Sequence, residues 1–365
     1  MTATINRLLD LAIQIQQVPA PTFHEGKRAE FLRNLFAKEN MRDVYIDSVN
    51  NVLARLPGNG KQLPLIVSAH MDTVFPESTS LRVTREDGRI YGPGIGDNSL
   101  SVAALFGLLW MLRERKIELP FDIWFVANVC EEGLGDLRGM KAVVDHFGAD
   151  VTAYLVLEGM SLGHIYHRAI GVRRYRVTAR TAGGHSWSDY GQPSAVHEAA
   201  HLVTQITALT LPVHPRTTLN VGLIKGGTGV NVLASDAIFD LDMRSESMDE
   251  LNALIEWVEN LIQSANKPDV KMETEIIGQR PAGEIAVNHP LVLLAEECLR
   301  AQGLSATLTS GSTDANVPLS RGYPSLVLGV STGGSAHTVN EYIDIEPVER
   351  GMECLVSFVE RVGKN

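Results

Sequence analysis

Two histidines and five carboxylates carry the chemistry that this sequence suggests. They stand where apolar segments end or within glycine-rich stretches: His70, Asp72, Asp97, Glu131, Glu132, Glu158 and His337. Imidazole nitrogens and carboxylate oxygens form a ligand set that suits zinc, with cobalt or manganese as substitutes. Five ligands are too many for one tetrahedral ion, but they suffice for two ions if one carboxylate bridges them.

Each of these residues also has an ordinary role open to it. His70 and Asp72 are two residues apart, so they share one face of a strand. They could be a metal ligand and its neighbour, or they could be an ordinary polar strand end. Asp97 alone could cap the helix that follows it, and Glu131 with Glu132 could be a solvated loop pair. The recurrence of such residues at several predicted strand ends favours a metal site over these separate roles.

Glu131 and Glu132 are adjacent, so their side chains cannot both point the same way from a strand end. One of them can bind metal while the other stays free to take a proton from a water molecule. The predicted chemistry is therefore metal-assisted hydrolysis.

Alternating strands and helices must position these residues. Residues 63–69, 121–127 and 153–157 are apolar runs typical of buried strands, and 100–112 and 137–147 are typical of helices between them. This alternation predicts an α/β domain with a mixed, mostly parallel sheet and helices on both faces. Ligands of such sheets bind beyond the carboxyl ends of the strands, which is where the candidate residues stand.

The pattern changes after residue 172. A strand, a helix, two strands, a helix and a strand are expected at 173–179, 194–209, 218–224, 237–243, 248–264 and 270–277, with Ser194 as the N-cap of the first helix. This is the order of a ferredoxin-like α+β domain. We therefore expect a discontinuous catalytic domain, 1–172 with 281–365, interrupted by an inserted domain, 173–280.

Composition narrows the class of protein. The chain has 365 residues, 44% of them hydrophobic and 21% charged, as in soluble globular proteins. Its net charge of −11 argues against a nucleic-acid partner and supplies no basic patch for a membrane. Cys130, Cys298 and Cys354 are widely spaced and form no CxxC pair, so we expect a reducing, cytoplasmic compartment. No signal-peptide core and no stretch of transmembrane length is expected.

A glycine-rich segment, Gly92 to Gly96, faintly suggests a nucleotide loop. It lacks the GxGxxG spacing, and Pro93 would remove a backbone donor. Nucleotide binding is therefore disfavoured.

The ordered motifs resemble one family. They are Ser68-Ala-His-Met-Asp72, Gly94-Ile-Gly-Asp97-Asn98, Glu131-Glu132-Gly133, Glu158-Gly159 and Ala336-His337-Thr-Val-Asn-Glu341, with Gly184-His185-Ser186 as a sixth. The chain resembles the co-catalytic zinc exopeptidases that include carboxypeptidase G, acetylornithine deacetylase, succinyl-diaminopimelate desuccinylase, aminoacylase and peptidase T. The resemblance implies the zinc exopeptidase fold and an inserted lid or dimerisation domain.

The same resemblance implies roles for the chemical residues. One zinc ion would be held by His70, Asp97 and Glu158, and the other by Asp97, Glu132 and His337, with Asp97 as the bridge. Asp72 would accept the other ring proton of His70 and fix its tautomer. Glu131 would be the general base, and His185 would stabilise the tetrahedral oxyanion, in dimeric members at the partner subunit's site.

Substrate contacts follow from the resemblance as well. Asn231, Arg244 and the loop Gly311-Ser312-Thr313 resemble the contacts to a substrate carboxylate, although Arg244 could pair instead with Asp240 or Asp242 on its own strand. Glu158 is typical of carboxypeptidase or deacylase members, whereas the surroundings of His185 look nearer to peptidase T. Gly159 also departs from the frequent proline.

The expected function is a dizinc exopeptidase that cleaves an amide bond next to a free carboxylate in small peptides. An N-acyl-amino-acid deacylase or a tripeptide aminopeptidase are alternatives, and a peptide-binding protein without catalysis is the non-enzyme alternative. A homodimer through the inserted domain is expected, because the strands of that domain leave an exposed edge.

Overall fold

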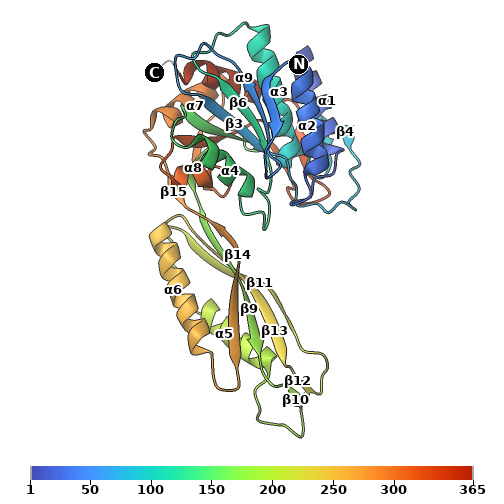
Figure 1. The fold of residues 1–365 in the computed structure, drawn as a ribbon, viewed down its shortest axis with the longest axis vertical. Helices are drawn as coiled ribbons and strands as arrows, with labels where there is room; N and C mark the ends of the chain where they lie inside the picture. Colours follow the sequence, from blue (N-terminus) through green and yellow to red (C-terminus); the bar gives the residue numbers. More distant parts are fainter. Residues whose placement is uncertain (1, 364–365) are drawn as a thin grey trace. The chain divides into compact units, whose positions relative to one another are not determined.

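A computed structural model describes residues 2–363 of the chain (Figure 1). It divides into two compact units, Met1–Ala169 with Glu284–Asn365, and Ile170–Gly283. Each unit has its own cluster of buried apolar side chains. The segment predicted as an insertion, 173–280, falls inside the second unit.

The first unit is built on a nine-stranded mixed sheet with the order β1-β2-β6-β3-β7-β17-β8-β15, and β16 pairs with β8. Its centre is parallel, because β3 (Leu65–His70) lies between β6 (Ile123–Asn128) and β7 (Ala153–Glu158), and β7 pairs with β17 (Ser325–Gly329). Antiparallel pairings flank this centre. The remaining strands are β1 (Arg42–Ile46), β2 (Val52–Leu56), β8 (His164–Ala169), β15 (Gly283–Glu284) and β16 (Thr307–Gly311). The predicted mixed α/β fold is confirmed, although the sequence pattern missed β8 and β15.

Helices pack around this sheet (Figure 1). Thr2 is the N-cap of the first helix, because its hydroxyl accepts a hydrogen bond from the backbone N–H of Ile5. The helices are α1 (Ala3–Gln16), α2 (Gly26–Lys38), α3 (Leu100–Glu114), α4 (Arg138–Phe147), α7 (Pro290–Ala301), α8 (Asn316–Ser320) and α9 (Pro347–Arg361). The sequence pattern did not predict the short helix α8.

The helical stretch Ile95–Glu114 includes α3 and is strongly apolar, with every residue from Leu100 to Leu112 buried. By length and composition it would reach across a membrane, so the expectation that no stretch has this length is wrong. In the structure, however, 94% of its apolar window is buried inside the protein. The stretch therefore serves as the central helix of the first core.

A small sheet of order β18-β19-β5-β4 brings two distant segments together. It consists of β4 (Thr84–Glu86), β5 (Arg89–Tyr91), β18 (Gly333–Gly334) and β19 (Tyr342–Asp344). The expected exposed hairpin at 81–91 is thus paired through β5 with β19. This pairing sets the glycine-rich segment that follows β5 beside the segment that carries His337.

The second unit contains a four-stranded antiparallel sheet with the order β11-β13-β9-β14. Its elements follow the β-α-β-β-α-β order of a ferredoxin-like sandwich. They are β9 (Gly171–Arg180), α5 (Ala195–Thr207), β11 (Thr217–Gly226), β13 (Asp236–Ser245), α6 (Met248–Ser264) and β14 (Lys271–Arg280), with a short ladder of β10 (Gly184–His185) and β12 (Val232–Leu233). Ser194 is the N-cap residue of α5, as predicted, although its hydroxyl accepts the N–H of Ala234 and not a helix N–H.

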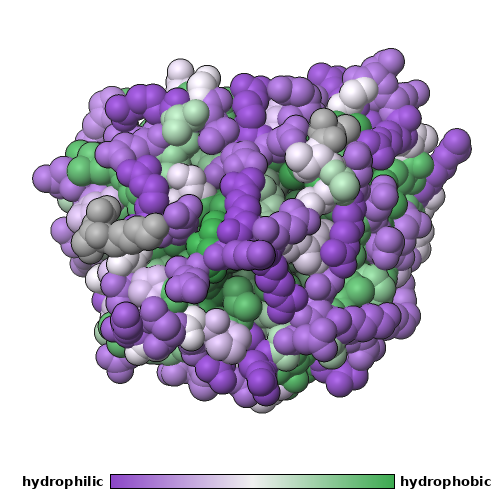
Figure 2. Space-filling model, turned by 90° about the horizontal axis from the view of Figure 1, so that it is seen from above, coloured by the Kyte–Doolittle hydropathy of each residue, from purple (hydrophilic) through white to green (hydrophobic). Residues whose placement is uncertain are grey.

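The surface seen from above is mainly hydrophilic, with hydrophobic residues recessed between the polar ones (Figure 2). Most of the large apolar side chains that the structure describes are accounted for by the two cores.

Candidate metal centre

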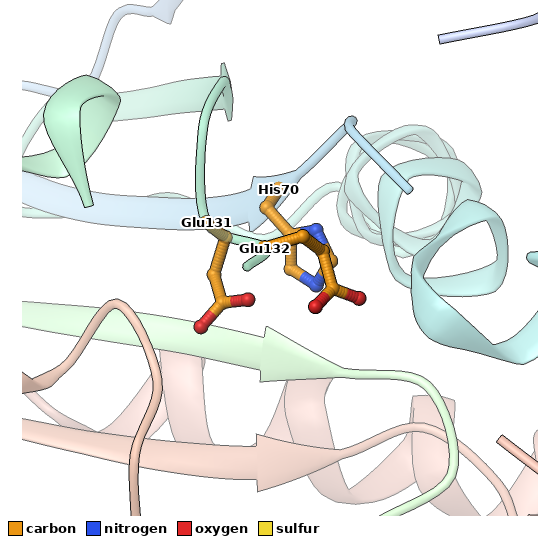
Figure 3. Close-up of side chains that lie close together, drawn as sticks. All are labelled: His70, Glu131 and Glu132. Atoms are coloured by element: carbon orange, nitrogen blue, oxygen red, sulfur yellow. The ribbon is translucent and has the colours of Figure 1, made fainter. Parts of the chain in front are cut away.

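The ends of β3 and β6 deliver the first group of candidate residues. His70 is the last residue of β3 and stands opposite Asn128 of β6 in the ladder, and Glu131 and Glu132 follow β6. One ligand atom from each of His70, Glu131 and Glu132 lies within 4.8 Å of the others. Both glutamate side chains extend from the loop to the same side, with their carboxylates near the ring of His70 (Figure 3), so the divergence expected from the sequence is not seen.

Asp97 stands at the centre of the cluster. Its Oδ1 lies 3.1 Å from Nε2 of His70, and its Oδ2 lies 3.1 Å from Nε2 of His337. Glu158 approaches His70, with Oε2 and Nε2 3.9 Å apart, and Oε1 of Glu132 lies 3.1 Å from Nε2 of His337. Two groups of three potential ligands result, and Asp97 belongs to both.

Electrostatics in this cluster favour a cation. Burial raises the pKa of Glu158, and the neighbouring Asp97 and Glu131 carboxylates raise it further, although His70 opposes them. Hydrogen bonds to the carboxylates of Asp97 and Glu132, which accept them, raise the pKa of His337 to about 10. Crowded, largely buried carboxylates outnumber the histidines, and buried charges are costly unless they are paired or bind a metal. The donor set and its excess of negative charge thus fit divalent metal ions.

Asp72 is fully buried and makes contacts that the sequence did not predict. Its Oδ1 accepts the backbone N–H of Glu131 and its Oδ2 that of Glu132, each at 3.0 Å. The hydroxyl of Thr22 also donates to Oδ2, at 2.9 Å. Nδ1 of His70 lies 3.1 Å from the carbonyl oxygen of Asp72 and 3.5 Å from Oδ1. Asp72 therefore contacts the ring of His70 and the main chain of both glutamates.

Asn98 positions Glu158 from both sides. Its side-chain N–H donates to the carbonyl of Leu157 at 2.9 Å, and its side-chain oxygen accepts the N–H of Gly159 at 3.0 Å. A proline after Glu158 could not donate this bond, and a Cβ at position 159 would lie 2.0 Å from the carbonyl oxygen of Gly96. Glycine in place of the frequent proline therefore has a local reason.

The segment Gly311-Ser312-Thr313 begins at the last residue of β16 and is tied to the end of β6. The next residue, Asp314, is buried and accepts a hydrogen bond from the side chain of Asn128 at 2.7 Å. Since Asn128 stands opposite His70 in the ladder, this bond holds the loop near the metal-ligand candidates. Gly311 itself packs against Tyr166, whose ring would lie 2.5 Å from an added Cβ.

Asp314, Asn128, Asn98 and Thr22 were missed as functional candidates by sequence reasoning. Their only signal is that they are polar and stand within or next to the motifs or at a strand end. Burial, which the motifs do not reveal, distinguishes Asp314, Asn128 and Asn98 from surface residues. Thr22 is half-buried and is distinguished by its hydrogen bond to Asp72.

His185 lies in the second unit, where β10 and β12 bring it next to Asn231. The N–H of Ser186, the residue after His185, donates to the carbonyl of Asn231 at 3.0 Å. Nδ1 of His185 accepts the backbone N–H of Trp187 at 3.1 Å and that of Ser188 at 3.4 Å. An Nδ1 that accepts hydrogen bonds carries no proton, so the neutral ring carries its proton on Nε2.

Arg244, also in the second unit, pairs with Asp242 on its own strand. Nε of Arg244 and Oδ2 of Asp242 lie 2.6 Å apart, and Arg174 donates to Oδ1 of the same carboxylate at 2.8 Å. This is the pairing that the sequence left open as the alternative to a substrate contact. The guanidinium remains 41% exposed at the side-chain level, so the pairing does not bury it.

The fold and the cluster together define a class: an α/β enzyme with a carboxylate and histidine site at the carboxyl edge of its sheet. A family model described as peptidase family M20/M25/M40 matches residues 66–361. The chain therefore belongs to this peptidase family. Its members are metallopeptidases and amidohydrolases, so this protein is an enzyme that acts on C–N amide bonds, and the non-catalytic alternative is wrong.

Individual relatives span much of this family. A succinyl-diaminopimelate desuccinylase of Corynebacterium glutamicum is 24% identical, over 93% of this chain and 92% of its own. A probable carboxypeptidase of Trichophyton verrucosum is 27% identical, over 84% of this chain and 72% of its own. A tripeptidase structure from Staphylococcus aureus superposes with a TM-score of 0.85 at 23% identity, with 99% of each chain covered. The names of these relatives differ in substrate, so they leave the subclass open.

Proposed function

We propose that this enzyme is a dinuclear metal exopeptidase that cleaves an amide bond next to a free carboxylate in small peptides, as carboxypeptidases do. The observation that carries the proposal is the shared Asp97, whose two oxygens each lie 3.1 Å from a different histidine. A carboxylate in that position suits a bridge between two ions.

His70, Asp97 and Glu158 would hold one ion, and Asp97, Glu132 and His337 the other. We propose Zn²⁺ at both positions, with Co²⁺ or Mn²⁺ as substitutes, because nitrogen and oxygen donors without a thiolate suit all three. Bound ions of this kind supply Lewis-acid activation of water and of a carbonyl group.

Glu131 is proposed as the general base. Its backbone is fixed by Asp72, and its carboxylate lies beside the ligand candidates His70 and Glu132 (Figure 3). Glu131 would take a proton from the attacking water as the new C–O bond forms, and would pass it to the amine nitrogen as the C–N bond breaks. His185, as the Nε2–H tautomer, can donate a hydrogen bond to the oxyanion of the tetrahedral intermediate.

Recognition of the substrate carboxylate is assigned to Asn231, Arg244, Gly311, Ser312 and Thr313. A guanidinium suits a carboxylate because its planar fork can bind both oxygens. Asp242 already occupies one edge of this fork, which orients the group while it stays partly exposed. Glu158, in place of an aspartate, favours a carboxypeptidase or a deacylase over an aminopeptidase.

Three peptides of one sequence can test the direction of cleavage: Ala-Ala-Ala, its N-acetyl derivative and its C-terminal amide. Because the proposed site binds a free carboxylate, we expect the zinc-loaded enzyme to hydrolyse the first two and to leave the amide intact. Cleavage of the amide with loss of activity on the acetylated peptide would identify an aminopeptidase. Hydrolysis of N-acetylalanine in preference to the tripeptides would identify a deacylase, the alternative that the desuccinylase relative favours.

A homodimer through the second unit is also proposed. Strand β11 stands at the edge of its sheet and exposes Leu223 and Ile224, by 40% and 53%. An exposed edge with apolar side chains is suited to pairing with a second copy. Sedimentation of the parent and of an Ile224→Lys variant tests this, with a monomeric parent as the contrary result.

The buried free thiols of Cys130, Cys298 and Cys354 agree with a cytoplasmic location, which stays a proposal.

A further inference from the structure

Backbone N–H groups of the glycine-rich segment after β5 bind the carboxylate of Glu341. Oε1 of Glu341 accepts the backbone N–H groups of Gly96 and Asp97, both at 2.8 Å, and Oε2 accepts that of Gly94 at 3.2 Å. The main-chain carbonyl of Glu341 accepts the N–H of Gly92 at 2.8 Å. These donors are therefore used within the protein, which explains a glycine-rich loop without a nucleotide.

The path of this loop depends on its glycines. Gly94 has a φ of +73°, which is unfavourable for residues with a side chain. A Cβ at Gly96 would lie 2.6 Å from the side chain of Met160. Backbone N–H groups can therefore converge on one point, and a buried carboxylate at that point satisfies them. Glu341 is fully buried and separated by 244 positions from Asp97.

Glu341 is linked by a short segment to a second candidate ligand, His337. The N–H of Glu341 donates to the carbonyl of Thr338 at 3.1 Å, and the N–H of Thr338 donates to the carbonyl of Ser335 at 3.2 Å. This compact turn joins the segment that carries His337 to the loop that carries Asp97. The positions of both residues therefore depend on the same carboxylate.

We propose that Glu341 is a positioning residue that sets the main chain of Asp97 and, with it, the affinity of both metal positions. The inference rests on the proposed dinuclear function. Its physical basis is that Asp97 is shared by both groups of ligands, so a displaced Asp97 weakens both. Groups that orient metal ligands commonly change metal affinity by about 10–100-fold when they are replaced.

Glu341→Gln is the direct test, because the amide keeps the size of the side chain but turns one acceptor into a donor facing an N–H group. Zn²⁺ affinity is measured by competition with a chromophoric chelator, in the parent, in Glu341→Gln and in the control Glu346→Gln, whose side chain is 76% exposed. We expect Glu341→Gln to bind Zn²⁺ about 10–100-fold more weakly. The control should match the parent. In Zn²⁺-saturated enzyme, kcat should fall while KM stays within about twofold, because the lesion displaces ligands and leaves the substrate contacts.

Parent-like Zn²⁺ affinity in Glu341→Gln would overturn the inference. Should this variant fail to unfold cooperatively on heating, Gly94→Ala replaces it, because an added Cβ there lies 2.9 Å from Cγ2 of Thr73 and disturbs the same loop. Parent-like affinity in Gly94→Ala would then be the contrary result. A parent protein that binds no Zn²⁺ would contradict the proposed function itself. If the parent binds two ions and the variant binds them with the same affinity, only the role of Glu341 is contradicted.

Discussion

Asp72 accepts a hydrogen bond from the backbone N–H of Glu131 on Oδ1, across 3.0 Å. Its second oxygen accepts the N–H of Glu132 at the same distance. One buried carboxylate thus fixes the main chain of two adjacent glutamates for which different roles are proposed. The sequence motif had suggested only a role toward His70, two residues earlier.

Replacing Asp72 by Asn tests this arrangement. An amide can accept the N–H of one glutamate, but its NH₂ group faces the N–H of the other, so one of the two bonds is lost. We expect kcat on the best peptide to fall by about 10–100-fold, as for other groups that orient a metal site. Asp10→Asn is the control, because the Asp10 side chain is 66% exposed. An unchanged kcat in Asp72→Asn would show that the two bonds are dispensable.

Substitutions of the two adjacent glutamates are expected to impair different properties of the enzyme. Glu131→Gln should keep Zn²⁺ affinity and peptide binding but lose about 10²–10⁴-fold in kcat, because the amide cannot take a proton. Glu132→Gln should weaken Zn²⁺ binding, because Glu132 lies 3.1 Å from His337 within one ligand group. Chelator competition and single-turnover hydrolysis measure the two effects separately.

This pair serves as its own control. The same chemical change is made at neighbouring positions, so a general effect on folding would affect both variants alike. If Glu131→Gln turned over as fast as the parent, Glu131 would not be the base. If Glu131→Gln also lost Zn²⁺, the division of roles between the two glutamates would be reversed or absent.

His185 should be found as the Nε2–H tautomer. Its Nδ1 accepts two backbone N–H groups, from Trp187 and Ser188, which a protonated Nδ1 could not do. In protein labelled with ¹⁵N-histidine, two-bond ¹H–¹⁵N correlations distinguish the tautomers. His185→Asn identifies the signal among the 11 histidines. A proton on Nδ1 in the neutral ring would contradict the proposed donor role, independently of activity.

Asp242 should contribute pH-dependent stability. Burial tends to raise its pKa, but hydrogen bonds from Arg244 and Arg174 outweigh this and lower the pKa below its usual range. A lowered folded-state pKa means that the stabilisation is complete above the unfolded-state value of about 3.9 and is lost as the pH falls through the folded-state pKa. Asp242→Asn should therefore cost on the order of 1 kcal/mol at pH 7. The difference from the parent should shrink in acid.

Thermal unfolding of the parent and of Asp242→Asn between pH 7 and about pH 2 measures this effect, because the change is expected below the unfolded-state pKa. Asp150→Asn, at an exposed position, is the matched control. A destabilisation that grew as the pH fell would have the wrong sign and would refute the ion-pair explanation.

Much of the candidate site was predictable because its residues stand at strand ends. His70 and Glu158 are the last residues of β3 and β7, and apolar runs mark those strands in the sequence. The helix over residues 100–112 was equally clear from its apolar composition. Composition alone, however, does not distinguish a buried helix from a membrane-spanning helix, because the two differ only in what packs around them.

Long-range polar contacts were not predictable in the same way. The glycine-rich loop before Asp97 carried a weak resemblance to a nucleotide loop, and only the fold shows Glu341 seated in it. Asn98, Asp314 and Thr22 are ordinary polar residues in the sequence. Asn98 and Asp314 gain their roles because distant segments bury them against groups that need partners, and Thr22, which is half-buried, gains its role from its hydrogen bond to Asp72.

The sequence by itself determined the types of ligand, their order along the chain and the strand ends that deliver them, because apolar periodicity and residue chemistry are local properties. The family resemblance already implied that Asp97 joins the two groups of ligands, whereas only the tertiary structure decided that Asp72 supports Glu131 and Glu132 and that Glu341 holds the loop of Asp97. Those relationships depend on which strands are neighbours in the sheet and on which polar groups are removed from water. Neither follows from the spacing of residues within one segment.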